Sequence, residues 1–352
     1  MSTILLYRIF LNKKTKWEVK SLKDKISVGI AGIGSCVPGK VITNDDLSKI
    51  VDTSDEWISS RSGIRERRIV DEDMATSDLC TEAAKRALED ANLDAKDIDL
   101  IIVATVTADM AFPSTACIVQ KNIGAVNAAA FDMSVGCSGF LYGIATGSNF
   151  ISSGIYKRVL VIGAEVLSKV LDWKDRSTCV LFGDGAGACI LESCQEGYGI
   201  ISYDLGADGE NGYFLTQPAG GSRMPASHDT VDNRLHYVHM DGKEVFKFAV
   251  RIMESTSLEA LKKANIELKD IDFLIPHQAN KRIINSAAKR LKIPNDRVYM
   301  NLDKYGNMSS ASIPVAIDEV YQKGLIKKGD TVLLVAFGAG LTWASVILKW
   351  SK

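Results

Sequence analysis

The chain contains an internal repeat, and this feature limits its possible folds more than any other. Residues 87–102 read ALEDANLDAKDIDLII and residues 260–275 read ALKKANIELKDIDFLI, with nine of sixteen positions identical at an offset of 173. The same offset places residues 159–162 (VLVI) over residues 332–335 (VLLV). Two separate segments that agree on one offset indicate a duplication of about 170 residues.

Each copy of the repeat predicts a helix followed by a buried strand. The predicted helices cover residues 77–92 and 247–265, where apolar residues recur at helical spacing. Continuous apolar segments, such as residues 100–106 and 159–162, are typical of strands covered on both faces. Alternating helices and strands favour mostly parallel sheets flanked by helices, one sheet in each copy. Residues 331–348 form the longest uncharged run, and its central glycines predict two strands around a turn rather than a membrane span.

On this basis we divide the chain into three parts. Residues 1–25 form an N-terminal extension, residues 26–195 a first half, and residues 196–352 a second half. The extension mixes a short apolar stretch with seven Lys or Arg residues, and no small-residue cleavage site follows. That pattern does not match a secretory signal, and the sequence assigns the extension no role.

Composition excludes several classes of function. The 42 Lys and Arg residues balance the 43 Asp and Glu residues, so no overall basic field favours nucleic acid. Seven cysteines without CxxC spacing indicate a reduced, cytoplasmic protein. The four histidines match no common zinc-ligand spacing, so no metal is expected. Residues 34–41 nearly spell a phosphate loop, but Val41 replaces the hydroxyl residue that would hold magnesium.

Cys137 is the candidate nucleophile. It follows an apolar segment and precedes a helical run over residues 139–152, with Gly136 and Gly139 beside it. A thiol at a strand-to-helix junction faces the positive end of the helix dipole. In such a place its pKa can fall from ~8.5 to roughly 3.5–7.5, which gives a thiolate near neutral pH.

His277 and Asn307 are the candidate partners of Cys137. His277 ends the predicted strand of the second copy, and parallel sheets place functional residues at the carboxyl ends of their strands. Asn307 precedes a second helical run, where simple helix capping is the alternative explanation. The offset of 173 aligns Cys137 with Ser310, three residues beyond Asn307. The two loops are therefore equivalent helix starts that converge on one pocket if the halves pack about a two-fold axis.

These three residues and their flanking motifs resemble the β-ketoacyl-acyl-carrier-protein synthase III family of the thiolase-like superfamily. The resemblance covers about residues 26–350 and rests on several strings: Asp52-Thr-Ser-Asp-Glu-Trp-Ile, Arg61 with Gly63-Ile-Arg-Glu-Arg, Ala111-Phe-Pro-Ser, the Cys137 loop, Phe182-Gly-Asp-Gly-Ala-Gly-Ala, Pro276-His-Gln-Ala-Asn, Tyr305-Gly-Asn and Ala336-Phe-Gly-Ala-Gly-Leu-Thr-Trp. It implies a five-layer αβαβα sandwich built from the duplication, and a homodimer.

The resemblance also implies an activity and a catalytic triad. A short acyl group, such as acetyl, passes from coenzyme A to Cys137. The acyl-enzyme then condenses with malonyl-acyl carrier protein, with loss of carbon dioxide, to begin fatty acid synthesis. The resemblance implies that the backbone N–H groups of Cys137 and Ala339 form an oxyanion hole. It also implies that His277 and Asn307 stabilise the enolate by donating hydrogen bonds to its oxygen. We therefore predict that His277 and Asn307 serve decarboxylation more than acylation. No cofactor is implied beyond the coenzyme A thioester substrates.

Further residues match binding positions of the family. The resemblance implies three groups: Trp57, Arg61, Arg176 and Asn280 for coenzyme A; Phe112, Leu181, Phe182 and Met240 for the acyl pocket; and Lys247, Arg282, Lys289 and Arg290 for the acyl carrier protein. Phe112 is expected to reach the partner subunit's pocket.

Two alternatives stay open. A condensing enzyme of secondary metabolism has the same fold, and a catalytically inactive relative would act as an acyl-binding scaffold. The sequence does not identify the acyl primer, because each methylene contributes only ~0.8 kcal/mol of burial and the shape of the pocket decides.

Overall fold

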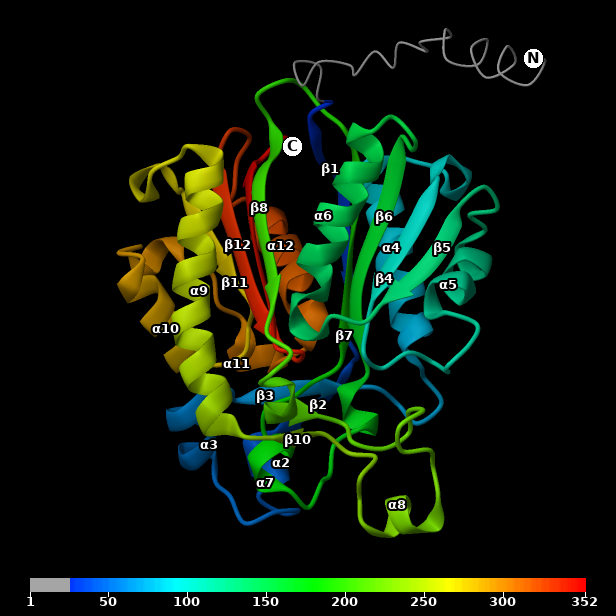
Figure 1. Ribbon diagram of the computed structural model, residues 1–352, viewed down its shortest axis with the longest axis vertical. Coiled ribbons are helices and arrows are strands. Elements are labelled where there is room, and N and C mark those ends of the chain that lie inside the picture. The colour runs from blue at the N-terminus through cyan, green and yellow to red at the C-terminus, as the bar shows by residue number, and fades with distance from the viewer. Residues whose placement is uncertain (1–25) are drawn as a thin grey trace, which may run out of the picture.

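The computed structural model describes residues 26–352, and the predicted extension over residues 1–25 lies outside the described residues. Two sheets form the centre of the molecule (Figure 1). The first contains, in spatial order, β1 (Val28–Cys36), β7 (Gly185–Ser193), β6 (Arg158–Glu165), β4 (Leu100–Ala104) and β5 (Ala129–Met133). The second contains β11 (Phe273–Pro276), β12 (Thr331–Gly338), β13 (Thr342–Lys349) and β8 (Gly199–Ala207).

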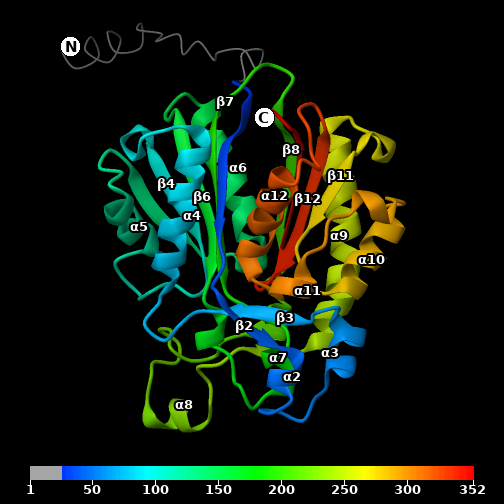
Figure 2. The ribbon, with the colours of Figure 1, turned by 180° about the vertical axis from the view of Figure 1, so that it is seen from behind.

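The helices make three layers around the two sheets, which gives the five-layer sandwich (Figures 1 and 2). One outer layer holds α4 (Thr76–Ala91) and α5 (Thr115–Ile123). The central layer holds α6 (Gly139–Ser152) and α12 (Ser312–Gln322), and the other outer layer holds α9 (Gly242–Ala264) and α10 (Lys281–Arg290). The thiolase-like sandwich that the resemblance implied is thus confirmed.

The duplication is visible in single residues. Asn92 ends α4 with φ 53°, and Asn265, one offset of 173 later, ends α9 with φ 54°. Both asparagines adopt the left-handed conformation that closes a helix, which Asn tolerates better than most residues. Strands β6 and β12 begin one offset apart, as do the short 3-10 turns at residues 136–138 and 309–311.

The sheets are mixed rather than mostly parallel, which corrects the prediction from the repeat. Strand β4 is parallel to β5 and β6, and β11 is parallel to β12. Antiparallel pairs join β6 to β7, β7 to β1, β12 to β13 and β13 to β8. For β12 and β13 the reason is the tight turn between them, which can only join antiparallel neighbours. The two buried strands predicted over residues 331–348 are confirmed by this hairpin.

Two element boundaries differ from their predicted positions, one at the start of a helix and one at the end of a strand. Helix α9 starts at Gly242, five residues before the predicted start, because the Asp241 carboxylate caps it by accepting from the backbone N–H groups of Lys243 and Glu244, both at 3.1 Å. Strand β4 ends at Ala104 rather than at Val106. The predicted helix over residues 139–152 matches α6.

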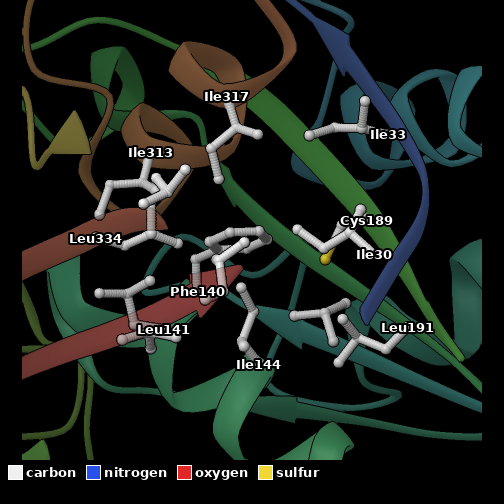
Figure 3. Close-up of a cluster of buried hydrophobic side chains, with 14 of the residues drawn as sticks. Ile30, Ile33, Phe140, Leu141, Ile144, Cys189, Leu191, Ile313, Ile317 and Leu334 are labelled. Carbon is white, nitrogen blue, oxygen red and sulfur yellow. The ribbon is translucent and has the colours of Figure 1, made fainter. Parts of the chain in front are cut away.

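The main core lies between the two sheets, around the central helices (Figure 3). Phe140 and Ile144 of α6 meet Ile313 and Ile317 of α12 there, and side chains of β1, β7 and β12 close the cluster. Full burial of each such side chain contributes about 1.5–3 kcal/mol. The central helices are therefore fixed from both sides, and the loops at their starts are held in fixed positions.

Shorter elements cap one end of the sandwich, where β6 and β12 finish (Figures 1 and 2). These are β2 (Lys40–Thr43), α2 (Asn44–Leu47), α3 (Asp55–Ser62), β3 (Glu66–Ile69), α7 (Arg176–Cys179), β9 (Leu215–Thr216), α8 (His228–Asp232), β10 (His239–Met240) and α11 (Leu302–Tyr305). The proposed division between residues 195 and 196 falls between β7 and β8 and stays a prediction. No helix within residues 26–352 is long and apolar enough to cross a bilayer.

Candidate active site

Cys137, His277 and Asn307 line one cavity under the cap. Cys137 lies in the 3-10 turn before α6, His277 follows β11, and Asn307 follows α11. The three come from segments up to 170 residues apart, and each is at most 9% exposed. The pocket predicted from the pseudo-equivalent helix starts therefore exists, with all three candidate residues on its wall.

The loops after β5 and β12 touch through their backbones beside Cys137. A Cβ atom placed on Gly338 would lie 2.4 Å from the Cys137 nitrogen, and one on Gly136 would lie 2.8 Å from the Ala339 nitrogen. Neither position has room for a side chain, so glycine is required at both. This close approach brings the backbone nitrogens of Cys137 and Ala339, the two candidate oxyanion donors, into adjacent loops.

The His277 side chain is held from one side. Its Nδ1 pairs with the Ser312 hydroxyl at 2.7 Å, and its ring meets Phe337 edge-on at 5.5 Å. Its Nε2 is buried without a hydrogen-bond partner among the described residues. Burial lowers the pKa of His277 to about 3, so the imidazole is neutral at pH 7. The neutral imidazole therefore has one nitrogen, Nε2, that is available to form a hydrogen bond with a ligand, and it carries no positive charge.

The Cys137 thiol differs from the sequence-based expectation. Burial raises its pKa to about 12, with a smaller raising effect from the Glu165 carboxylate and lowering hydrogen bonds from Ser309 and its own backbone. Removal from water costs a thiolate more than the start of α6 returns, because the dipole effect is only about 0.3–2 kcal/mol. The free enzyme therefore carries a thiol, and the predicted resting thiolate is wrong.

The raised pKa predicts a pH dependence. Only the thiolate is nucleophilic, so alkylation of Cys137 by iodoacetamide should accelerate about tenfold for each pH unit between roughly pH 7 and pH 9. Peptide mapping by mass spectrometry separates this cysteine from the exposed Cys117. A rate that is already constant above neutral pH would instead favour a thiolate stabilised by the helix dipole.

Asn307 is fixed by its backbone and by its side-chain oxygen. Its N–H donates to the Leu181 carbonyl at 2.9 Å, and its carbonyl accepts from the Gly183 N–H at 3.0 Å. Its Oδ1 accepts from the Ser309 N–H at 2.8 Å. Since the oxygen is occupied, the amide NH₂ is the end of this side chain that remains for a ligand in the pocket.

The residues predicted to bind coenzyme A lie close together beside the cavity. The guanidinium groups of Arg61 and Arg176 lie over the Trp57 ring, with Cζ 4.6 and 4.9 Å from its centroid. Asn280 donates to the Arg61 carbonyl at 3.1 Å, and Arg61 and Asn280 both line the cavity. All four residues are thus brought together by α3, α7 and the start of α10.

The predicted acyl-pocket residues divide into two places. Phe182 lines both the main cavity and a second, mostly apolar cavity behind Cys137, whereas Leu181 and Met240 line only the main one. Phe112 is 85% exposed and lines neither. The apolar side chains of the second cavity were not predicted from the sequence, because they come from short segments without a motif: Val106, Leu167, Val170, Leu215 and Val238.

The four residues predicted for the acyl carrier protein are exposed on α9 and α10. Lys247 pairs with Glu244 at 2.6 Å, and Arg290 pairs with Glu254 at 2.7 Å. Arg282 lies 5.9 Å from the Phe246 ring centroid. Lys247 and Arg290 are thus already ion-paired with carboxylates of α9. Among the described residues, Arg282 and Lys289 form no such ion pair.

Two polar residues of the site were not found from the sequence. Ser312, the partner of His277, and Glu165, buried at the end of β6, belong to no motif that was recognised. Ser312 begins α12 and Glu165 ends β6, and neither lines the cavity itself, so no local pattern marked them. Within residues 26–352, no cluster of three or more His, Cys, Asp or Glu side chains is arranged to hold a metal ion.

Comparisons with known proteins agree with this geometry. Two family models match, described as 3-oxoacyl-[acyl-carrier-protein] synthase III over residues 131–209 and its C-terminal region over residues 261–350. A β-ketoacyl-[acyl-carrier-protein] synthase III of Caldanaerobacter subterraneus is 65% identical over 329 residues, covering 94% of this chain and 99% of the relative.

Solved structures give the same result. The crystal structure of 3-oxoacyl-[acyl-carrier-protein] synthase III from Aquifex aeolicus matches with a TM-score of 0.85 at 47% identity, covering 92% of this chain and all of that one (100%). The crystal structure of 3-oxoacyl-(acyl carrier protein) synthase III from Pseudomonas aeruginosa matches with a TM-score of 0.86 at 40% identity, covering 93% of this chain and 99% of that one. Fold and pocket thus define a thiolase-fold condensing enzyme, which is an acyltransferase. The chain belongs to the β-ketoacyl-[acyl-carrier-protein] synthase III family.

Proposed function

We propose that the chain starts fatty acid synthesis by condensing a short acyl-coenzyme A with malonyl-acyl carrier protein through an acyl group on Cys137. The observation that carries this proposal is the single cavity lined by Cys137, His277 and Asn307. The Cys137 sulfur attacks the acyl-coenzyme A carbonyl, the acyl–sulfur bond to coenzyme A breaks, and the thiol proton leaves with coenzyme A as its thiol. The backbone N–H groups of Cys137 and Ala339 stabilise the tetrahedral oxyanion.

The second step breaks the malonyl carbon–carbon bond. Carbon dioxide leaves, and the electron pair stays on the thioester as an enolate. His277 and the Asn307 amide donate hydrogen bonds to the enolate oxygen as its charge develops. For His277 this requires the tautomer that carries the proton on Nε2, with Nδ1 accepting from Ser312. The enolate carbon then attacks the acyl carbonyl, and Cys137 leaves and regains a proton from solvent.

A turnover assay tests the proposal. Acyl-coenzyme A and malonyl-acyl carrier protein should release coenzyme A and carbon dioxide in equal amounts, and no release with any primer would favour the inactive scaffold. Malonyl-coenzyme A should replace the carrier-protein substrate poorly, whereas equal use of both would favour a condensing enzyme of secondary metabolism. A panel of acetyl, branched and longer acyl-coenzyme A substrates, compared by kcat/KM, identifies the primer.

We also propose that Trp57, Arg61 and Arg176 hold the adenine end of coenzyme A. Trp57→Ala should raise KM for the acyl-coenzyme A about tenfold with little change in kcat, because stacking on an aromatic ring is worth roughly 1–3 kcal/mol per base. KM for malonyl-acyl carrier protein should stay constant, which separates loss of stacking from a general defect. Trp173→Ala is a matched control, since that tryptophan lies outside the cavity.

Three further proposals concern partners and location. We propose a homodimer in which Phe112 reaches the partner subunit, which its 85% exposure supports. Docking of the acyl carrier protein on α9 and α10 is proposed for the exposed Lys247, Arg282, Lys289 and Arg290. No metal or other cofactor enters the proposed mechanism. The seven free cysteines support a reducing location, which we take to be the cytoplasm.

A further inference from the structure

A buried carboxylate bridges the two halves directly beneath the candidate active site. Glu165 ends β6 and has no solvent exposure. Its carboxylate accepts from the Thr107 hydroxyl at 2.6 Å, from the Val106 N–H at 3.2 Å and from the Ser309 hydroxyl at 3.0 Å. Weaker contacts at 3.3 Å come from the hydroxyls of Thr105 and Ser310. Burial raises the pKa of Glu165 to about 7. The effects that lower this pKa are hydrogen bonds from uncharged hydroxyl and backbone N–H groups.

A buried carboxyl group without a cation is costly and is retained only where its hydrogen bonds serve a purpose. The bond to Ser309 has a specific structural consequence. Ser309 adopts φ 47°, the left-handed region that non-glycine residues rarely occupy. In this conformation its N–H donates to Asn307 Oδ1 at 2.8 Å. The chain of contacts therefore runs from Glu165 through Ser309 to the side chain of Asn307.

The internal repeat provides a comparison within the same molecule. The offset of 173 aligns Ser309 with Gly136, which has φ 53°, and aligns Gly338 with Glu165. The turn of the first copy is thus made by Gly136, and the residue equivalent to Glu165 is Gly338 of the second copy. The turn of the second copy is made by Ser309 and is bonded to Glu165 of the first copy. Since glycine satisfies the backbone at this turn without strain, the Ser309 hydroxyl and its acceptor need a separate explanation.

We propose that Glu165 is a positioning residue for the condensation, which holds the Ser309 turn so that the Asn307 amide NH₂ faces the pocket. A hydroxyl anchored on Glu165 keeps Ser309 in the left-handed conformation. The Ser309 N–H then occupies the Asn307 oxygen and prevents the amide from flipping. The inference rests on the enolate-binding role proposed above for Asn307, and it extends that role to a residue that does not itself line the cavity.

Glu165→Gln, Ser309→Ala and Ser309→Gly test this inference. Each should slow malonyl decarboxylation by the acylated enzyme, because part of an oxyanion-type donor is lost. Glu165→Gln should slow it at least about tenfold more than it slows acylation of Cys137. The Ser309 variants also lose the hydrogen bond that lowers the pKa of Cys137, so they should slow acylation as well. Ser309→Gly should be faster in decarboxylation than Ser309→Ala, since both lack the hydroxyl but glycine adopts positive φ freely. A glycine variant that is as slow as the alanine variant would overturn the backbone account.

A double-mutant cycle distinguishes positioning from a general structural role. In the Asn307→Ala background, Ser309→Ala should cost little further decarboxylation, because residues that act through one another are non-additive. Full additivity would overturn the proposal. Asp132→Asn is the matched control, since Asp132 also accepts two close N–H bonds, at 2.7 Å each, but at the start of α5. It should lower the melting temperature without changing the ratio of the two half-reactions.

A crystal structure of Ser309→Ala separates this inference from the proposed function. Loss of the bond between the residue-309 N–H and Asn307 Oδ1, or a rotated amide, supports the inference whatever role Asn307 has. An unchanged Asn307 side chain in both Ser309→Ala and Glu165→Gln would overturn it. If Asn307→Ala itself decarboxylates malonyl thioester normally, the enolate role fails, and the structure of the variant still decides the positioning.

Discussion

Replacing Cys137 with serine is expected to abolish the acyl-enzyme and, with it, all condensation. A serine hydroxyl in this pocket would have to lose its proton without a charged base beside it, because the neutral His277 has a pKa of about 3 and Glu165 accepts its hydrogen bonds from other groups. An alcohol without a strong neighbouring base is a poor nucleophile. Intact-protein mass spectrometry after addition of acetyl-coenzyme A should therefore show no acylated Cys137→Ser protein.

Cys179→Ser provides the control for that measurement. Cys179 is also buried, and burial raises its pKa to about 11, but it does not line the cavity. The Cys179→Ser protein should be acylated at the wild-type rate. Acylation of Cys137→Ser, or loss of acylation in the control, would place the nucleophile elsewhere.

His277→Ala and Asn307→Ala are expected to separate the two half-reactions. Each removes one proposed donor to the enolate, so malonyl decarboxylation should fall about 10²–10³-fold, as is typical for one oxyanion-hole donor. Acylation of Cys137 should fall far less, because its oxyanion binds backbone N–H groups that neither substitution removes. Mass spectrometry measures the first half-reaction and carbon dioxide release the second.

The raised pKa of Cys137 makes the His277 variant the sharper test. A thiol with a pKa of about 12 loses its proton during acylation, and His277 carries an unpartnered buried nitrogen on the same cavity. If His277→Ala loses acylation as completely as Cys137→Ser, then His277 is the base for the thiol and the division of labour is wrong. His236→Ala, a histidine outside the cavity, should leave both half-reactions unchanged.

The sequence by itself determined the fold class and the three central residues of the candidate site. The repeat predicted two similar halves, because equal spacing of helix and strand patterns imposes equal topology, down to the left-handed Asn92 and Asn265. The five-layer arrangement of those halves came from the resemblance to a known family. Cys137 was identified because glycines beside a cysteine at a helix start are a local pattern. For these features the signal is short-range, and neighbouring residues in the sequence carry it.

Only the tertiary structure decided the environment of those residues. The Cys137 pKa rises because side chains and loops distant in the sequence exclude water, and this desolvation outweighs the helix dipole that the sequence suggested. Glu165 and Ser309 lie 144 positions apart, and nothing near either residue announces their hydrogen bond. The strand directions were also decided by the tertiary structure, since periodicity marks a buried strand but not the orientation of its neighbour. Burial and contact depend on where distant segments meet, and that is settled only when the two halves pack against each other.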